Sequence, residues 1–330
     1  MDKVVEVNNL TKTFTFSVKN PDKGFLANLF APSKKSITAV NDISFSIEEG
    51  ETLAFIGPNG AGKSTTIKIL TGILFPSSGK VKVLGLSPQK DRKQLALNIG
   101  TVFGQRSQLL FNLPIIDSFE LFSKVYEVDK AAYQKQKDKL IELFDLAEII
   151  DQPVRKLSLG QRMRAEIAVA LIHEPPIIFL DEPTIGLDVV AKRKLRETLN
   201  AINKEFNTTI FLTSHDAGDI ESICNRTIII NHGTTIYDGS TAQLKRQYLN
   251  KKVIRIALGD ENESALELKR EGITVEKNNK REAVFEVDTK KTSIDEVLKE
   301  VIQGKTIQDI TIEDPPLEEI IGRIYETKAA

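Results

Sequence analysis

The feature that most constrains this chain is the run from Gly57 to Ser64, which reads Gly-Pro-Asn-Gly-Ala-Gly-Lys-Ser. An apolar segment, 52–56, precedes the run and a helix-like segment, 65–70, follows it, as the phosphate-loop pattern requires. Glycines let the backbone N–H groups of such a loop turn towards a phosphate, and the start of the following helix adds a partial positive charge. The alternative interpretation is a glycine-rich turn that only opens a helix. The motif and its flanking segments together favour the phosphate loop.

The residues of this loop would bind the phosphates, their charge and their metal ion. The side chain of Lys63 is long enough to reach the terminal phosphates, and the hydroxyl of Ser64 can ligate Mg²⁺. A nucleoside triphosphate with Mg²⁺ is therefore the expected ligand. The residues expected to contact it are Gly57, Asn59, Gly60, Gly62, Lys63, Ser64 and Thr65.

A second motif is a buried apolar run, 177–180, that ends in Asp181 and Glu182. Ligand sites of parallel α/β sheets lie beyond the carboxyl ends of the strands. We therefore expect Asp181 to face the Mg²⁺ shell and Glu182 to face the attacking water. Taken alone, acidic residues at a strand end more often belong to a solvated turn, so this assignment depends on the phosphate loop.

Short apolar runs alternate with helical patterns over the first 240 residues, which predicts a parallel α/β sheet. The predicted helices include one that Asp117 caps, a second over 133–144 and a third over 191–206. The predicted buried strands are 52–56, 99–103, 177–180, 209–213 and 227–230.

The amino end is predicted to be strand-rich, with strands over 4–16 and 37–47. The segment between them, 17–36, is interpreted as an insertion with an apolar centre flanked by lysines. Such a loop either contacts a membrane surface or partner, or folds its apolar side chains back onto the sheet. After residue 241, two predicted strands, 253–258 and 283–287, and a helix over 294–302 indicate a small α+β appendix.

The composition argues against several classes of protein. Lys plus Arg number 45 and Asp plus Glu 46, so the net charge of −1 gives no basic field that would attract nucleic acid. The single cysteine, Cys224, cannot form an internal disulfide, which fits a cytosolic protein. The longest stretch without Asp, Glu, Lys or Arg, 94–105, is shorter than the roughly 20 residues of a spanning helix. We therefore expect a chain that does not cross a membrane by itself.

Four further features complete a resemblance to a known family. They are Gln105 after a predicted strand, the run Leu157-Ser158-Leu159-Gly160-Gln161, the run Gly186-Leu187-Asp188, and His215 after another strand. In order and spacing, the chain from about Val4 to Ser240 resembles the nucleotide-binding subunit of an ATP-binding-cassette (ABC) transporter.

The resemblance implies a P-loop NTPase core of the ABC-ATPase type. This core has a mixed sheet with helices, an antiparallel β subdomain and an inserted helical subdomain at about 106–165. The ABC ATPase domain would span 1–240, and 241–330 would be an accessory α+β domain.

The resemblance also implies roles for single residues. Two subunits stack head to tail around two ATP molecules, and each site is completed by the neighbour's run with Ser158, Gly160 and Gln161. Asp188 would contact the nucleotide as well. Gln105 would ligate Mg²⁺ and take part in catalysis, and His215 would hold the γ-phosphate and the attacking water. Phe14, at the expected end of the first strand, would stack on adenine, with Phe16 as the alternative. The family usually has Gly at the position of Leu159.

The function that the resemblance implies is ATP hydrolysis that powers a membrane transporter from the cytoplasmic face. Its partners would be separately encoded permease subunits and a second copy of the chain or a paralogous ATPase subunit. The stretch 101–126 resembles subunits that serve drug-exporter-like (ABC-2 type) permeases in bacteria, which favours export. Two alternatives are a soluble ABC ATPase that clamps nucleic acid or the ribosome, and a regulatory subunit without transport. The balanced charge argues against the first, and the intact Lys63, Asp181, Glu182 and His215 argue against an inert subunit.

Overall fold

The computed structural model of the chain forms two compact units, Met1–Gly239 and Ser240–Ala330. The role of the second unit as an accessory domain stays a prediction. The residues that the structure describes are 2–18, 33–104, 107–247, 251–259, 268, 270–279, 281–302, 306–315 and 317–327.

The centre of the first unit is a six-stranded sheet with the strand order β5-β6-β7-β3-β8-β9. Five neighbouring strands run parallel, as the alternation of apolar runs and helices predicts. Asp181 pairs with Thr213 in the register of β6 and β7, so the carboxyl ends of these strands lie side by side. The strands are β3 (Thr52–Ile56), β5 (Ile99–Phe103), β6 (Ile177–Asp181), β7 (Thr209–Thr213), β8 (Arg226–Asn231) and β9 (Thr234–Ser240).

The amino-terminal strands form a separate antiparallel sheet of β2 (Ser33–Glu48), β1 (Lys3–Val18) and β4 (Ser78–Val83), in that order. The strand ends predicted at 16 and 37 were wrong, because pairing continues as far as Val18 and Ser33. Side-chain hydroxyls extend the ladder there, as between Thr15 Oγ1 and Ser36 Oγ at 3.2 Å. The apolar centre of the predicted insertion lies outside the described residues.

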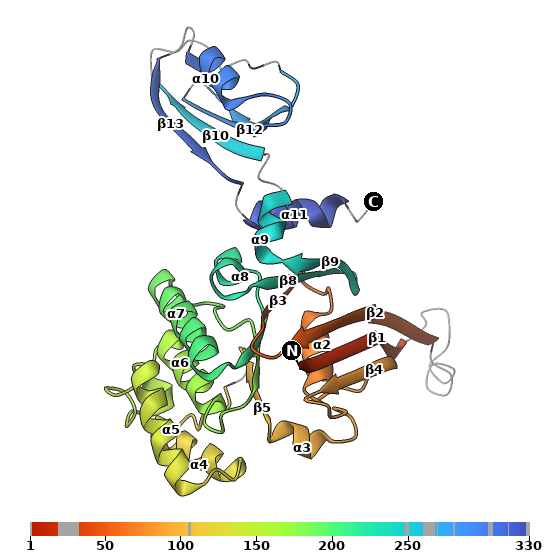
Figure 1. Cartoon of the computed structure of the whole chain (residues 1–330), viewed down its shortest axis with the longest axis vertical. Coiled ribbons are helices and arrows are strands. Elements are labelled where there is room, and N and C mark those ends of the chain that lie inside the picture. Colours follow the sequence, from red (N-terminus) through yellow and green to blue (C-terminus); the bar gives the residue numbers. More distant parts are fainter. Residues whose placement is uncertain are drawn as a thin grey trace. The chain divides into compact units, whose positions relative to one another are not determined.

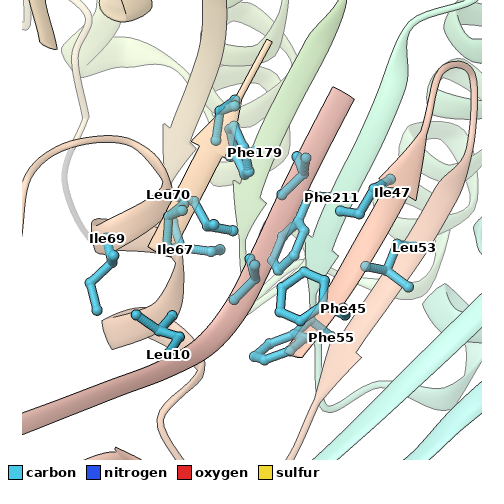
Figure 2. Close-up of a cluster of buried hydrophobic side chains, with 14 of the residues drawn as sticks. Leu10, Phe45, Ile47, Leu53, Phe55, Ile67, Ile69, Leu70, Phe179 and Phe211 are labelled. Carbon is cyan, nitrogen blue, oxygen red and sulfur yellow. The ribbon is translucent and has the colours of Figure 1, made fainter. Parts of the chain in front are cut away.

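Helix α2 (Lys63–Leu70) and the inner faces of both sheets share one hydrophobic core. Figure 2 shows its aromatic part, in which the rings of Phe55 and Phe179 pack against Phe211 with centroids 5.3 and 5.5 Å away. All five residues of β3 are buried. Each buried phenylalanine contributes about 1.5–3 kcal/mol, so the segments on either side of the phosphate loop are firmly anchored.

The remaining helices of this unit cover the parallel sheet and extend from it. In Figure 1, α6 and α7 lie on one side of that sheet, and α2 and the antiparallel sheet lie on the other. The helices are α3 (Arg92–Ala96), α4 (Ile115–Val125), α5 (Lys130–Leu143), α6 (Leu159–Ala170), α7 (Val189–Phe206) and α8 (Ala217–Ile223), with a 3₁₀ turn at Val154–Lys156.

Helices α4 and α5 begin earlier than predicted, and α7 begins at Val189 instead of 191. Helix α4 has Pro114 at its N-cap position and Asp117 in its first turn, so the cap predicted at Asp117 was wrong. The N–H of Ile116 bonds to the carbonyl of Ile150, which replaces a side-chain cap. Helix α5 starts after Asp129, whose carboxylate accepts from two N–H groups of the first turn.

The second unit has a four-stranded antiparallel sheet in the order β11-β12-β10-β13. The two strands and the helix that the sequence predicted are present, and the helix has the predicted bounds. Side chains such as Ile254, Phe285 and Val297 form its core. The elements are α9 (Thr241–Gln247), β10 (Lys251–Leu258), β11 (Ile273–Asn278), β12 (Glu282–Asp288), α10 (Ile294–Ile302), β13 (Ile307–Glu313) and α11 (Leu317–Thr327).

None of the helices in the described part of the chain combines the length and hydropathy that a membrane-spanning segment needs.

Candidate functional site

The loop between β3 and α2 requires glycine at several positions. Gly60 and Gly62 have φ angles of 83° and 109°, in the left-handed region that side chains disfavour. A Cβ atom at Gly57 would lie 2.5 Å from the carbonyl oxygen of Ile230, and one at Gly62 would lie 2.4 Å from that of Ala39. The loop is therefore packed backbone to backbone against β8 and β2, which fixes its curvature.

This loop lines a cavity of about 770 Å³. Two polar side chains from other strand ends, Glu182 and His215, reach the same cavity, together with Ala39 and Ile185. The structure thus brings together all the phosphate contacts that the sequence predicted, namely Gly57, Asn59, Gly60, Gly62, Lys63, Ser64 and Thr65.

Lys63 is the first residue of α2 and is only 8% exposed. Its Nζ donates to the carbonyl oxygen of Gly57 at 2.6 Å and to that of Pro58 at 3.4 Å. The same Nζ lies 3.9 Å from Glu182 Oε1. A positive charge is therefore held at the loop, within reach of a carboxylate at the end of β6.

Hard oxygen donors meet where β6, β7 and α2 converge. Ser64 Oγ donates to Asp181 Oδ1 at 3.3 Å, and Thr213 Oγ1 donates to the same oxygen at 2.6 Å. A hydroxyl beside a carboxylate is the donor set that Mg²⁺ prefers, so Ser64 and Asp181 fit the predicted ion. The third predicted ligand, Gln105, lies outside the described residues. The sequence analysis did not identify Thr213 as a partner of Asp181, although Thr213 is the last residue of the strand that pairs with β6.

Glu182 and His215 form a hydrogen-bonded pair beside the loop, with 2.6 Å between Oε2 and Nδ1. The φ angle of Glu182 is +56°, which is uncommon for a residue with a side chain. Its N–H donates to the carbonyl oxygen and to Oγ1 of Thr213, both at 3.1 Å, which holds this conformation. The Glu182 side chain is 20% exposed and that of His215 63% exposed, so the pair faces the cavity with the histidine outermost.

Ser158 caps α6 in a capping box. Its Oγ accepts from the N–H of Gln161 at 3.2 Å, and Gln161 Oε1 accepts from the N–H of Ser158 at 2.9 Å. One acceptor site of the hydroxyl and one N–H are thus used within the helix, and the hydroxyl proton remains as a donor.

The Ser158 run does not line the phosphate-loop cavity. It borders a second cavity of about 510 Å³, with Ser158, Gly160, Gln161 and Asp188 in its wall. Asp188 caps α7 by accepting from the N–H of Ala191 at 2.8 Å. A single chain therefore brings these four residues together, but around another cavity than the one at Lys63.

Leu159, at the position where the resemblance expects glycine, is the first residue of α6. Its Cδ2 would lie 3.0 Å from a Cβ atom at Gly186, in the loop before α7. A Cβ atom at the next residue, Gly160, would lie 2.9 Å from that of Ala191 in α7. Glycine at position 186 therefore leaves room for the leucine, and glycine at position 160 lets the starts of α6 and α7 approach each other.

Phe14 lies inside β1, not at its end as expected, because the strand continues to Val18. Its ring is 38% exposed, and Lys12 Nζ lies 5.0 Å from the ring centroid. Phe14 is opposite Ile37 in the hairpin, and Phe16 is 41% exposed. Neither ring lines the phosphate-loop cavity, so the adenine assignment stays a prediction.

Comparisons with known proteins agree with this geometry. The sequence model of the family described as ABC transporter matches residues 40–185, which contain the phosphate loop, the Ser158 run and Glu182. The ABC transporter ATP-binding protein NatA of Bacillus subtilis (strain 168) is 32% identical over 215 residues, 65% of this chain and 87% of that protein. The Nod factor export ATP-binding protein I of Neorhizobium galegae is 32% identical over 229 residues, 69% of this chain and 65% of that protein.

A solved structure shares the fold. It is the dimeric structure of a post-hydrolysis state of the ATP-binding cassette MJ0796 bound to ADP and Pi, with 26% identity and a TM-score of 0.59. The likeness covers 72% of this chain and 98% of that one. The phosphate loop with its converging carboxylates, the family match and the relatives together show that the chain belongs to the ABC transporter family, as an ATP-binding subunit that hydrolyses ATP.

Proposed function

We propose that the chain powers the export of a substrate through separately encoded permease subunits, and that it does so from the cytoplasmic face of the membrane. The observation that carries this proposal is that Lys63, Ser64, Glu182 and His215 line one cavity, while Asp181 accepts a hydrogen bond from Ser64 beside it. Their polar atoms make contacts of 2.6 to 3.9 Å with one another. A set of this kind suits phosphoryl transfer, in which positioning and charge stabilisation supply most of the catalysis.

Each group has a distinct proposed role. Lys63 offsets the charge of the terminal phosphates, and Glu182 accepts a proton from the attacking water or orients it. Ser64 and Asp181, together with Gln105, hold Mg²⁺, which supplies further positive charge at the phosphates when bound. His215 holds the Glu182 carboxylate and the γ-phosphate in place. Phe14 provides a ring face for adenine.

Two subunits are proposed to form each complete site. In one chain Ser158, Gly160, Gln161 and Asp188 border a different cavity from Lys63, which supports a role at the nucleotide of a neighbouring subunit. The similar cassette MJ0796 is dimeric with ADP and Pi bound. The neighbour is a second copy of this chain or a paralogous ATPase subunit, and ATP binding closes the pair while hydrolysis reopens it.

The proposed contact with the permease lies within 101–126. Leu121 and Val125 are exposed and four residues apart, so they share one face of α4. Phe111 and Leu113, in the preceding loop, are exposed as well. Apolar side chains of this kind favour a protein partner, and the Nod factor export protein among the relatives supports export. The net charge of −1 argues against a nucleic-acid clamp.

The composite site can be tested with two variants that damage opposite halves of it. Ser158→Arg is expected to abolish hydrolysis without weakening ATP binding to the isolated subunit, and Lys63→Ala is expected to impair the subunit's own site. In a mixture, one site of each heterodimer carries both lesions and the other is intact, so part of the activity should return. Ser293→Arg is the matched control, because Ser293 and Glu296 make the same reciprocal cap on α10.

Two outcomes would contradict the proposal. If Ser158→Arg weakens ATP binding to the monomer as much as Lys63→Ala does, the head-to-tail arrangement is wrong. If the chain hydrolyses ATP but never co-purifies with a polytopic membrane protein from its own host, transport is wrong and a soluble clamp becomes the better explanation.

A further inference from the structure

Helix α8 carries a buried carboxylate that the proposed catalytic roles do not use. Asp219 is 0% exposed, and its side chain accepts hydrogen bonds from three separate segments. Ser214 Oγ donates to Oδ2 at 2.8 Å, Thr184 Oγ1 donates to the same oxygen, and Arg196 Nε donates to Oδ1 at 2.7 Å. A buried charge is tolerated only when it is paired and hydrogen-bonded in this way.

The two hydroxyl donors belong to the loops that carry the proposed catalytic pair. Thr184 follows Glu182 by two residues, and Ser214 directly precedes His215. Thr184 is 2% exposed and Ser214 is 0% exposed. One carboxylate oxygen of Asp219 therefore ties both loops together.

Arg196 of α7 joins this cluster from the neighbouring helix, which lies beside α8 in Figure 1. Its Nη2 donates to Oδ1 of Asp216, the residue after His215, at 2.8 Å. A Cβ atom at Gly218 would lie 2.8 Å from both terminal nitrogens of the guanidinium. Glycine at this position therefore lets the arginine lie against α8 and bind Asp216 and Asp219 together.

We infer that Asp219, with Arg196 as its counter-charge, is a positioning group that fixes the Glu182 and His215 loops relative to one another. This inference rests on the catalytic roles proposed for Glu182 and His215. If it is correct, loss of a hydroxyl donor to Asp219 slows hydrolysis. ATP binding is unaffected, because β3 and α2 hold the phosphate loop independently.

Thr184→Val removes one donor and keeps the shape of the side chain. We expect kcat to fall about 10- to 100-fold, the range for a misplacement of about 1 Å, while the Kd of ATP is unchanged. Thr184→Ser keeps the hydroxyl and should restore kcat. Thr198→Val is the matched control, since Thr198 is 4% exposed on α7 and donates to the carbonyl of Lys194 at 2.9 Å. It should leave kcat unchanged.

A second measurement separates positioning from a structural role. In a Glu182→Gln background, Thr184→Val should slow single-turnover hydrolysis less than it does in the wild type, because the pair that Asp219 positions is already broken. Thermal melting checks that each variant is folded. Should Thr184→Val fail to fold, Ser214→Ala removes the other hydroxyl donor and takes its place in the same comparison.

The results also distinguish failure of the positioning role of Asp219 from failure of the proposed function. A wild-type kcat in Thr184→Val together with an inactive Glu182→Gln overturns the positioning role and leaves the proposed function standing. Equal losses in Thr184→Val and Thr198→Val overturn it too. If Glu182→Gln itself turns over ATP normally, the role of Glu182 in the proposed function fails first.

Discussion

The short hydrogen bond between Glu182 and His215 predicts strong coupling between these residues. The bond is 2.6 Å long, and the other oxygen of the carboxylate lies 3.9 Å from Lys63 Nζ. Glu182→Gln keeps the size of the side chain but removes its basicity. His215→Ala keeps the carboxylate but leaves it without the imidazole that holds it. A double-mutant cycle tests whether the two side chains act as one unit.

The size of the coupling follows from the type of bond. Loss of a general base costs about 10²-fold or more in rate. A hydrogen bond to a charged group contributes about 1.5–3 kcal/mol, and about 1.4 kcal/mol corresponds to a factor of ten. We therefore expect His215→Ala alone to slow hydrolysis about 10- to 100-fold. The double variant should be slower than Glu182→Gln only by what His215 contributes at the γ-phosphate, because His215 then has no carboxylate to hold.

The assay is single-turnover hydrolysis with ATP below the enzyme concentration, alongside titration of a fluorescent ATP analogue. All three variants should bind the analogue, since Lys63 and the loop are unchanged. His173→Phe serves as a control for removal of an imidazole that lies outside the phosphate-loop cavity. Rate losses that simply multiply in the double variant would refute the coupling and would leave His215 with its role at the γ-phosphate alone.

Three further predictions concern the loop and a histidine elsewhere. Lys63→Ala should reduce nucleotide affinity or turnover, because it removes the charge next to the loop. Titration with the ATP analogue measures the affinity. Unchanged affinity together with unchanged turnover would show that Lys63 does not act on the nucleotide. Gly57→Ala would place a Cβ atom 2.5 Å from the carbonyl oxygen of Ile230, so the loop must shift at a cost of about 1–3 kcal/mol. Thermal melting and ATP titration should both show this loss, and wild-type values in both would contradict the packing. The rings of His173 and Tyr126 are stacked with their centroids 3.6 Å apart, and burial lowers the pKa of His173 from 6.5 to about 4. As the pH drops, the unfolded chain therefore takes up a proton before the folded chain does, and the free energy of unfolding decreases from pH 6.5 towards pH 4. The full pKa shift corresponds to about 3 kcal/mol of stability, and partial exposure of the ring reduces this to about 1–2 kcal/mol. In urea unfolding at pH 7 and pH 4.5, His173→Phe should therefore lose less stability than the wild type. Equal losses in the two proteins would show that His173 is not the origin of the pH dependence.

The elements predicted best were those whose pattern is local and buried. The strand 209–213 has the predicted bounds because all five residues are buried between other strands, so each had to be apolar or β-branched. The strands β11 and β13 were not predicted, because they are the outer strands of their sheet and most of their residues are exposed. The start of α4 was misplaced because a backbone carbonyl distant in sequence, that of Ile150, satisfies its first turn. Nothing in the local sequence signals that bond.

The site shows the same division. Lys63, Ser64, Asp181 and Glu182 could be predicted, because the loop and the strand ends carry recognisable runs of residues. Thr213 could not, since its role depends on being paired with Asp181 in the register of two parallel strands. Asp219 was missed for a similar reason, because its donors come from segments between 5 and 35 residues away in sequence.

The phosphate loop and the Glu182–His215 pair differ in the contacts that hold them in place. The phosphate loop is packed against the backbone of β2 and β8 and is fixed within one chain. The Glu182–His215 pair is held by the carbonyl oxygen and Oγ1 of Thr213, and through side-chain bonds by the Asp219 cluster. Ser158 contributes nothing to the loop of its own chain and faces a separate cavity. A variant of the loop should therefore affect binding, and a variant of the side-chain supports should affect the rate of hydrolysis. A variant at Ser158 should affect only the activity of the assembled pair of subunits. Measurements of ATP binding, of the rate of hydrolysis and of the activity of mixed subunits therefore distinguish the roles of the loop, of the Glu182–His215 pair and of Ser158.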